Sequence, residues 1–356
     1  MFRLGELFSG PGGLACGAIK ADIGKDDFRI FHAWANDFDE YACATYRKNI
    51  CKNENAKSVI CGDVRELIID KDHLGEIDAF AFGFPCNDFS VVGEQKGFKG
   101  NYGPLYSYGV KVLQVFQPQW FLAENVSGLS SANDGEAFKK IMQDLHDTGY
   151  RIYPHLYKFE QYGVPQNRHR IIIVGIREDI CLKLPFEFRP PSPVPYKDCD
   201  VSVEKALANI PVNATNNEIP LTTEKVKARL SHIKPGQNAF NAELPEELRL
   251  NVKGAKISQI YRRLEADKPS YTVTGSGGGG THIYHYKELR ALTNRERARL
   301  QTFDDSYEFV GSKERVRKQI GMAVPPRGAQ IIFEAVLRTF AGESYESIDC
   351  NIPFEN

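Results

Sequence analysis

The sequence contains no CxxC pair, no long apolar run and almost no net charge. Its eight cysteines are scattered singly, so neither a zinc knuckle nor a disulfide framework is indicated. No apolar stretch approaches the roughly 20 residues of a membrane-spanning helix, and we expect no membrane segment. Scattered free thiols are typical of a reducing compartment, which favours a cytoplasmic protein.

The charge is distributed unevenly along the chain. The net charge is −1 at pH 7 over 356 residues, which by itself argues against a nucleic-acid-binding protein. Residues 225–270, however, carry ten Lys or Arg residues against five Asp or Glu residues. Such a surplus is found on ordinary solvated surfaces as well as on surfaces that contact phosphates. Composition leaves these two interpretations open.

Residues 1–180 alternate short apolar runs with amphipathic stretches. We expect strands at 3–8, 30–35, 79–83, 120–124 and 170–176, and helices at 42–49, 108–116 and 137–148. Alternating strands and helices predict an α/β protein with a doubly wound, mostly parallel sheet. Ligands of such sheets bind beyond the carboxyl ends of the strands.

A proline-rich segment marks the end of this pattern. Four prolines fall within residues 188–195, and proline continues neither a helix nor a central strand. We interpret the segment as a linker into a smaller, irregular domain. Helical patterns return at 294–301 and 328–340.

A glycine-rich turn, Phe-Ser-Gly-Pro-Gly-Gly at residues 8–13, follows the first expected strand. Glycines at this place let a ligand approach the backbone closely. The second expected strand leads to Asp37, close to the interval of roughly 20 residues at which nucleotide-binding folds place a ribose-binding carboxylate. Asp37 could equally cap a helix, but together the two features favour an adenosine-bearing ligand. Asp63, after another apolar stretch, is placed to accept from an adenine amino group.

Four reactive or charged side chains follow or precede expected strands. Cys86 comes after Pro85 at the end of strand 79–83, Glu124 ends strand 120–124, and Arg168 and Arg170 begin the last strand. Alone, a cysteine is usually structural and arginines usually lie on the surface. Together, a thiol, a carboxylic acid and two guanidiniums at one edge of a sheet form a set that a pyrimidine ring can use.

These segments, in this order, resemble the DNA cytosine-5 methyltransferases of bacterial restriction–modification systems. Asn87, Tyr102 and Met322 depart from the Gln, Arg and Asn that are usual in the family. The matching elements are FxGxGG at 8–13, PC…FS at 85–90, ENV at 124–126, QxRxR at 166–170, RxLTxRExARLQ at 290–301 and GMAVPP at 321–326, which is similar to the family's GNAVPP.

The resemblance implies methyl transfer from S-adenosyl-L-methionine to C5 of a cytosine that is flipped out of double-stranded DNA. Cys86 would attack C6 of the base, Glu124 would hold or donate a proton at N3, and Arg170 would hydrogen-bond O2. Arg168 would hold a phosphate or the catalytic loop. The residues expected to bind the cofactor are Phe8, Gly10, Gly12, Leu14, Asp37, Phe38, Asp63, Val64, Leu105 and Val324.

The resemblance also divides the chain into a catalytic and cofactor-binding domain (1–184), a target-recognition domain (185–311) and a C-terminal segment that returns to the catalytic domain (312–356). It gives the basic surplus a role in phosphate contacts. We expect a monomer that binds no metal, and a cognate restriction endonuclease is a conceivable partner. DNA contacts are expected from Ser90, Gln166, Thr272 and Val273.

One alternative remains open from the sequence. A eukaryotic branch of the same family methylates tRNA, so the chain could be a tRNA cytosine-5 methyltransferase. The long, basic segment between Arg177 and Arg290 favours a reader of duplex DNA. The recognised DNA sequence is not predicted, because base readout depends on the geometry of a few side chains in the groove.

Overall fold

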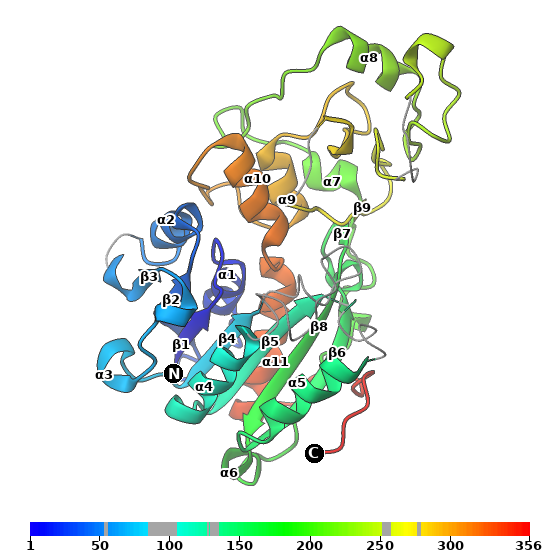
Figure 1. Ribbon diagram of the computed structural model, residues 1–356. Coiled ribbons are helices and arrows are strands. Elements are labelled where there is room, and N and C mark those ends of the chain that lie inside the picture. The colour runs from blue at the N-terminus through cyan, green and yellow to red at the C-terminus, as the bar shows by residue number, and fades with distance from the viewer. Residues whose placement is uncertain (53–55, 85–104, 127, 129–134, 251–257, 276–278) are drawn as a thin grey trace.

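A computed structural model describes the chain apart from residues 53–55, 85–104, 127, 129–134, 251–257 and 276–278. A seven-stranded sheet of order β3-β2-β1-β4-β5-β8-β6 forms its centre (Figure 1). The five neighbouring strands β3, β2, β1, β4 and β5 pair in parallel, whereas β8 is antiparallel to both β5 and β6. The strands are β1 (Phe2–Leu7), β2 (Ile30–Asp37), β3 (Val59–Cys61), β4 (Ala79–Gly83), β5 (Trp120–Val126), β6 (Tyr150–Lys158) and β8 (His169–Arg177).

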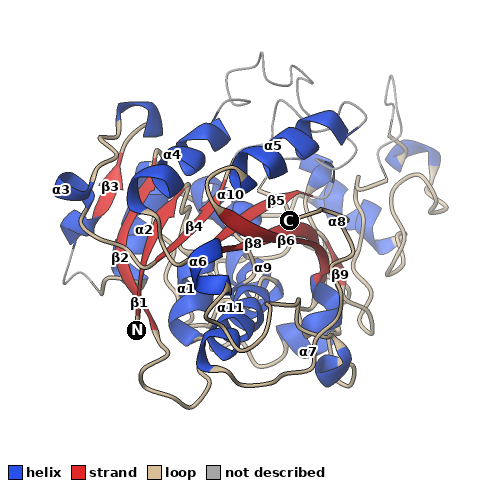
Figure 2. Ribbon diagram, turned by 90° about the horizontal axis from the view of Figure 1, so that it is seen from below, coloured by secondary structure: helices blue, strands red, loops and turns tan. Residues whose placement is uncertain are grey.

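Helices cover both faces of this sheet (Figure 2). Along β4, Ala79 and Ala81 pack into one hydrophobic cluster with α1 (Gly13–Lys20) and α11 (Pro326–Ala341). The alternate residues Phe80 and Phe82 pack into a second cluster with helices α4 and α5. Successive side chains of a strand point to opposite faces, so both faces of β4 are buried, as in a doubly wound fold. The remaining helices of this part are α2 (Glu40–Asn49), α3 (Lys71–Leu74), α4 (Tyr106–Phe116), α5 (Glu136–His146) and α6 (Glu178–Cys181).

The predicted fold class is confirmed, and each of the five predicted strands corresponds to a strand of the sheet. The sequence analysis missed β3 and β6, which form the two edges of the sheet. β3 is only three residues long. β6 contains Pro154, which argues against a strand unless that strand lies at an edge, where one face of its backbone needs no partner.

Residues between β8 and α11 form a second, less regular part of the chain. A two-stranded sheet connects it to the first part, because β9 (Ser270–Tyr271) pairs in parallel with β7 (Gln166–Asn167), which precedes β8. The helices of this second part are α7 (Val203–Leu207), α8 (Glu224–Ser231), α9 (Asn294–Leu300) and α10 (Lys313–Met322). Short 3-10 turns lie at Ala56–Ser58, Val64–Glu66, Phe159–Tyr162, Val194–Tyr196, Glu246–Leu248 and Gly279–Thr281. None of the helices in the described part of the chain is long and apolar enough to cross a membrane.

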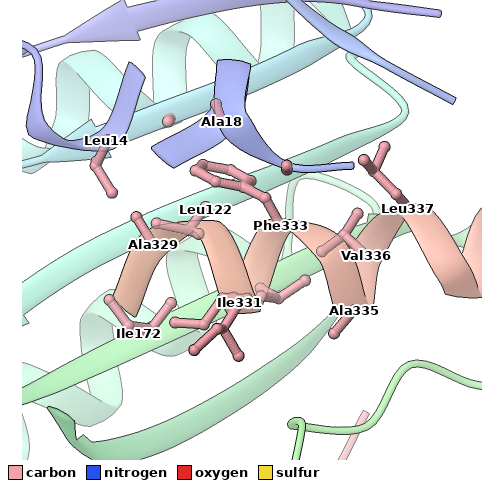
Figure 3. Packing of buried hydrophobic residues seen from close by; sticks show 14 of the residues in the cluster. Leu14, Ala18, Leu122, Ile172, Ala329, Ile331, Phe333, Ala335, Val336 and Leu337 are labelled. Atoms are coloured by element: carbon pink, nitrogen blue, oxygen red, sulfur yellow. The ribbon is translucent and has the colours of Figure 1, made fainter. Parts of the chain in front are cut away.

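Helices α1 and α11 lie against each other over one face of the sheet, and Figure 3 shows Leu14 and Ala18 of α1 facing Ala329 and Phe333 of α11. A Cβ atom added to Gly17 would lie 2.6 Å from the Cβ of Ala329 and 2.6 Å from a backbone oxygen of α11. The absence of a side chain at Gly17 therefore sets how closely the two helices approach. This contact holds the C-terminal helix to the N-terminal part of the chain.

We predict that Gly17→Ala destabilises the protein, because the new methyl group must push α11 away. Overpacking of a filled core costs about 1–3 kcal/mol, more than the ~0.5–1 kcal/mol that alanine gains within a helix. Urea unfolding measures the change. Gly62→Ala is the control, because a Cβ at Gly62 meets open space. Equal stabilities of the two variants would contradict the packing argument.

Candidate active site

The glycine-rich turn after β1 is held against the end of β2. Ser9 donates its backbone N–H to the carbonyl of Asn36 at 3.1 Å. The Asp37 carboxylate accepts from the Gly10 N–H at 2.8 Å and from the Asp39 N–H at 2.9 Å. Gly10 has φ 53°, a left-handed conformation that glycine adopts without strain. The turn and the acidic strand end therefore form one unit.

Asp37 is almost fully buried, and this burial raises the pKa of its carboxyl group although the two N–H donors lower it. Each carboxylate oxygen has two lone pairs, so both can accept a further hydrogen bond. A small cavity of about 40 Å³ lies beside this group and is lined by Gly10, Asp37, Phe38 and Met322, among others. Three residues expected to bind a cofactor therefore meet at one cavity.

Phe38 projects at the mouth of this cavity with 64% of its surface exposed. The Lys318 ammonium of α10 lies 5.7 Å from the centre of its ring and 3.7 Å from the Asp39 carboxylate. A flat, exposed aromatic ring next to a hydrogen-bonding carboxylate suits a ligand with a planar base and a ribose. Met322, which stands where the resembled family usually has Asn, is 62% exposed here and offers no strong hydrogen bond.

The other residues expected at the cofactor are distributed over both faces of the sheet. Phe8 packs against the cluster that contains Val64 and Leu105, and Leu14 and Val324 share the cluster on the opposite face of the sheet. A Cβ on Gly12 would meet the Tyr307 hydroxyl at 2.9 Å. Asp63 is not among the residues that line the cavity with Asp37. Its carboxylate instead accepts from the Arg65 guanidinium at 2.9 Å, which lowers its pKa.

Glu124 and Arg170 meet at adjacent ends of β5 and β8. The Arg170 Nε lies 2.9 Å from the Glu124 Oε1, and the two side chains are 13% and 14% exposed. Glu124 also lies opposite Gly83 of β4, where a Cβ would be only 3.1 Å from the Glu124 Oε2. The missing side chain at Gly83 therefore leaves room for the carboxylate. An acid and a guanidinium are thus held together at the strand edge, as the sequence predicts.

Cys86 and Ser90 lie outside the described residues, as do Asn87 and Tyr102. The chain that leads to Cys86 is described as far as Phe84. Asn125, only 4% exposed, donates its side-chain amide to the Phe84 carbonyl at 3.1 Å. The sequence analysis gave Asn125 no role, although it stands between Glu124 and Val126 in the ENV element. It fixes the end of β4 next to Glu124.

The resemblance implies that Arg168 holds a phosphate or the catalytic loop, and the structure places its side chain inside the protein. The side chain is 1% exposed and donates to the carbonyls of Val273 at 3.2 Å, Gly321 at 3.2 Å and Ala323 at 2.8 Å. Burial, and then the charge of Arg170, lower its pKa. Arg168 therefore joins its own strand to two other segments from within the protein and is not exposed for a phosphate contact, whereas the predicted catalytic loop lies outside the described residues.

Gln166 and Val273 are also fully buried, so the structure does not place them where DNA could reach them. The Gln166 amide accepts from the Val273 N–H at 2.7 Å and donates to the Gln301 side chain at 2.9 Å. Thr272 is half-buried and donates its hydroxyl to the Asn167 carbonyl at 2.6 Å. Among the predicted DNA contacts that the structure describes, Thr272 alone is partly accessible to solvent.

Part of the basic surplus in residues 225–270 is likewise internal. Arg263 is 7% exposed and donates to four backbone carbonyls, among them Tyr286 at 2.7 Å and Ile233 at 3.0 Å. Arg229 is 5% exposed and donates to the Leu248 carbonyl at 2.8 Å. The structural role of these two arginines reduces the number of cations available for phosphate contacts.

Comparisons with known proteins agree with the geometry. The family model for C-5 cytosine-specific DNA methylases matches residues 2–338. The chain is 60% identical to the Type II methyltransferase M.BbvI of Brevibacillus brevis, over 100% of this chain and 96% of the relative. It is 40% identical to M.NgoFVII of Neisseria gonorrhoeae, over 97% and 88%.

Solved structures support the same fold. A prophage-encoded Escherichia coli methyltransferase has a TM-score of 0.73 at 22% identity, with coverage of 96% of this chain and 100% of that one. The Dnmt2 methyltransferase of S. pombe has a TM-score of 0.60 at 18% identity, with coverage of 95% and 98%. At these identities the likeness concerns the arrangement of helices and strands only.

We predict that Arg168→Met strongly destabilises the protein, because three buried carbonyls lose a donor. A buried unsatisfied polar group costs about 1–3 kcal/mol, so we expect a loss of about 3 kcal/mol or more in denaturant unfolding. Arg3→Met is the control, because Arg3 is 53% exposed in its ion pair with Asp78, and such pairs contribute about 1 kcal/mol or less. A loss no larger than that of the control would argue against this role.

Proposed function

The chain belongs to the C-5 cytosine-specific DNA methylases and is a DNA (cytosine-5)-methyltransferase, and we propose that Cys86 is its nucleophile. The observation that carries the assignment is the Glu124–Arg170 pair at 2.9 Å, next to the strand that leads to Cys86. A flipped cytosine needs one acid and one donor for its N3 and O2 edge, and this pair supplies both.

In the proposed reaction the Cys86 thiolate forms a bond to C6 of the cytosine, and the ring electrons move to C5. C5 then takes the methyl group, its proton leaves to a base, and elimination breaks the bond between sulfur and C6. Covalent attack divides one difficult substitution into easier steps. The thiolate is the reactive form, and nearby arginines would favour it.

Glu124 and Arg170 act on the opposite edge of the base. As the thiolate adds, negative charge develops on the ring, and a proton held at N3 by Glu124 neutralises it. Arg170 hydrogen-bonds O2. A guanidinium has five N–H donors and a carboxylate has two oxygens, so the pair keeps capacity for the base after contacting each other. Arg168 acts by positioning this strand, not by contacting substrate.

The residues around the Asp37 cavity fit S-adenosyl-L-methionine. Asp37 presents a buried carboxylate for ribose hydroxyls, and the exposed Phe38 ring offers a surface for adenine. Gly10 and Gly12 keep the turn free of side chains, and we propose further cofactor contacts from Phe8, Leu14, Asp63, Val64, Leu105 and Val324. When bound, the cofactor supplies an electrophilic methyl group.

We propose that residues 1–184 form the catalytic domain, that 185–311 form the target-recognition domain, and that 312–356 return to the catalytic domain. The close packing of α11 against α1 supports the last boundary. We further propose a monomer that acts in the bacterial cytoplasm on a short site in double-stranded DNA. The curated relatives are named as Type II methyltransferases, which supports a cognate restriction endonuclease that cuts the same site.

The tRNA alternative receives no support from the curated relatives, since one 30% identical chain from Aeropyrum pernix is named as a DNA (cytosine-5-)-methyltransferase. A methyl-transfer assay with labelled cofactor separates the two substrates. We expect incorporation into duplex DNA and none into tRNA. Bisulfite sequencing of host DNA that carries the gene then identifies the methylated cytosine.

We predict that Asp37→Asn weakens binding of S-adenosyl-L-methionine about tenfold or more, because hydrogen bonds to charged groups contribute about 1.5–3 kcal/mol. Isothermal titration of the purified protein measures the affinity. Asp22→Asn is the control, since Asp22 accepts from Gly24 at 2.7 Å in a surface loop. Unchanged affinity in Asp37→Asn would remove Asp37 from the cofactor site.

We predict that Cys86→Ser abolishes methylation and prevents trapping on DNA that contains 5-fluorocytosine. Fluorine at C5 cannot leave as a proton, so it blocks elimination and retains the enzyme on the DNA, but only where sulfur has already bonded to C6. Denaturing gels show the trapped complex. Glu124→Gln should slow methylation by about 10²-fold or more, while its DNA binding persists. A covalent adduct formed by the serine variant would refute the assignment of Cys86.

A further inference from the structure

A second cavity, of about 280 Å³, lies between helices α9 and α10 and the segment around residue 220. The two helices lie side by side (Figure 1). The cavity shares no lining residue with the Asp37 cavity, and neither Glu124 nor Arg170 belongs to it. Its charged or titratable lining residues are Glu218, His282, Arg297, Lys313, Glu314 and Arg317.

Arg297 of α9 is 2% exposed, yet no described residue accepts a hydrogen bond from its guanidinium. Its neighbours differ in this respect. Arg290 contacts Glu296 at 2.7 Å, Arg295 donates to the Tyr307 carbonyl at 2.7 Å, and Arg299 contacts Asp305 at 2.6 Å. A buried charge without a partner is costly, and the described residues supply no hydrogen-bond acceptor for the Arg297 guanidinium.

Arg317 of α10 reaches the same cavity, and its Nε atom is buried without a hydrogen-bond partner in the described structure. Burial, and then the charge of Arg317, lower the pKa of Arg297 to about 10, so the Arg297 guanidinium remains charged at neutral pH. Burial, followed by the charges of these two arginines, lowers the pKa of His282 to about 4, which leaves that ring neutral.

Acidic residues do not neutralise the two arginines. Glu218 and Glu314 line the cavity but are exposed at its rim, where Lys313 is exposed as well. Within the described chain, neither glutamate lies within ion-pair distance of Arg297 or Arg317. The interior of the cavity therefore presents two guanidiniums, a neutral imidazole and no carboxylate in contact with them.

We propose that this cavity binds a phosphate group through Arg297 and Arg317. Guanidiniums match the geometry of phosphate oxygens and form strong, charge-assisted hydrogen bonds with them. The RxLTxRExARLQ element leaves position 297 unspecified, so the chemistry of methyl transfer does not account for this arginine. The phosphate comes either from the DNA backbone, which rests on the DNA substrate of the proposed function, or from a free phosphate ion.

Thermal unfolding tests the free ion without DNA or methylation. A ligand that binds the folded state stabilises it, so inorganic phosphate should raise the Tm of the wild-type protein by about 2 °C or more relative to chloride at equal ionic strength. Arg297→Met and Arg317→Met should lose this increase. Arg151→Met is the control, because it removes the same charge at an exposed ion pair with Glu187, and it should retain the increase.

DNA binding at several salt concentrations tests the other source. Each phosphate contact contributes about one unit to the slope of log affinity against log salt. A slope reduced by about one in Arg297→Met, and unchanged in Arg151→Met, identifies a DNA phosphate as the occupant. If Arg297→Met loses the increase in Tm caused by inorganic phosphate but keeps the wild-type salt slope, the occupant is a free phosphate ion. If Arg297→Met and Arg317→Met alter neither measurement, the proposal is overturned, whatever their methylation activity.

Discussion

The guanidinium of Arg168 is the contact on which the rest of the structure depends. It lies inside the protein and donates to carbonyls of three residues, Val273, Gly321 and Ala323. These residues belong to the less regular part of the chain and to the segment that leads into α11. One buried cation thus joins the sheet to the segment at Val273 and to the segment that leads into α11. Gln166 and Gln301 extend the same hydrogen-bond network.

This network positions residues of the proposed active site without itself contacting the substrate. Arg170, two residues beyond Arg168, carries the ion pair with Glu124. Ala323 lies between Met322 at the Asp37 cavity and Val324, which packs with Leu14. The two parts of the proposed site, the Glu124–Arg170 pair and the Asp37 cavity, are therefore both connected along the chain to the same buried guanidinium.

The arginines of this chain show how burial and partners decide the role of one residue type. Arg168 and Arg263 are buried and donate to several backbone carbonyls, so they hold the fold. Arg170 is slightly exposed and paired with an acid at a strand edge, so it remains available to a substrate. Arg297 is buried without a partner in the described structure, which is the condition of an anion site. No sequence pattern separates these cases, because each depends on atoms far away along the chain.

The sequence by itself determined the class of fold, the order of the central strands along the chain and the residues that meet at the Asp37 cavity and at Glu124. These follow from the periodicity of apolar residues and from short sequence motifs at the ends of strands, both of which are local properties of the sequence. Only the tertiary structure decided that Gln166, Arg168 and Val273 are internal, that Asn125 holds the end of β4 at Phe84 and that β6 is a strand despite its proline. Burial and edge position arise from contacts between distant segments, and a local pattern contains no information about which carbonyl will face a given guanidinium.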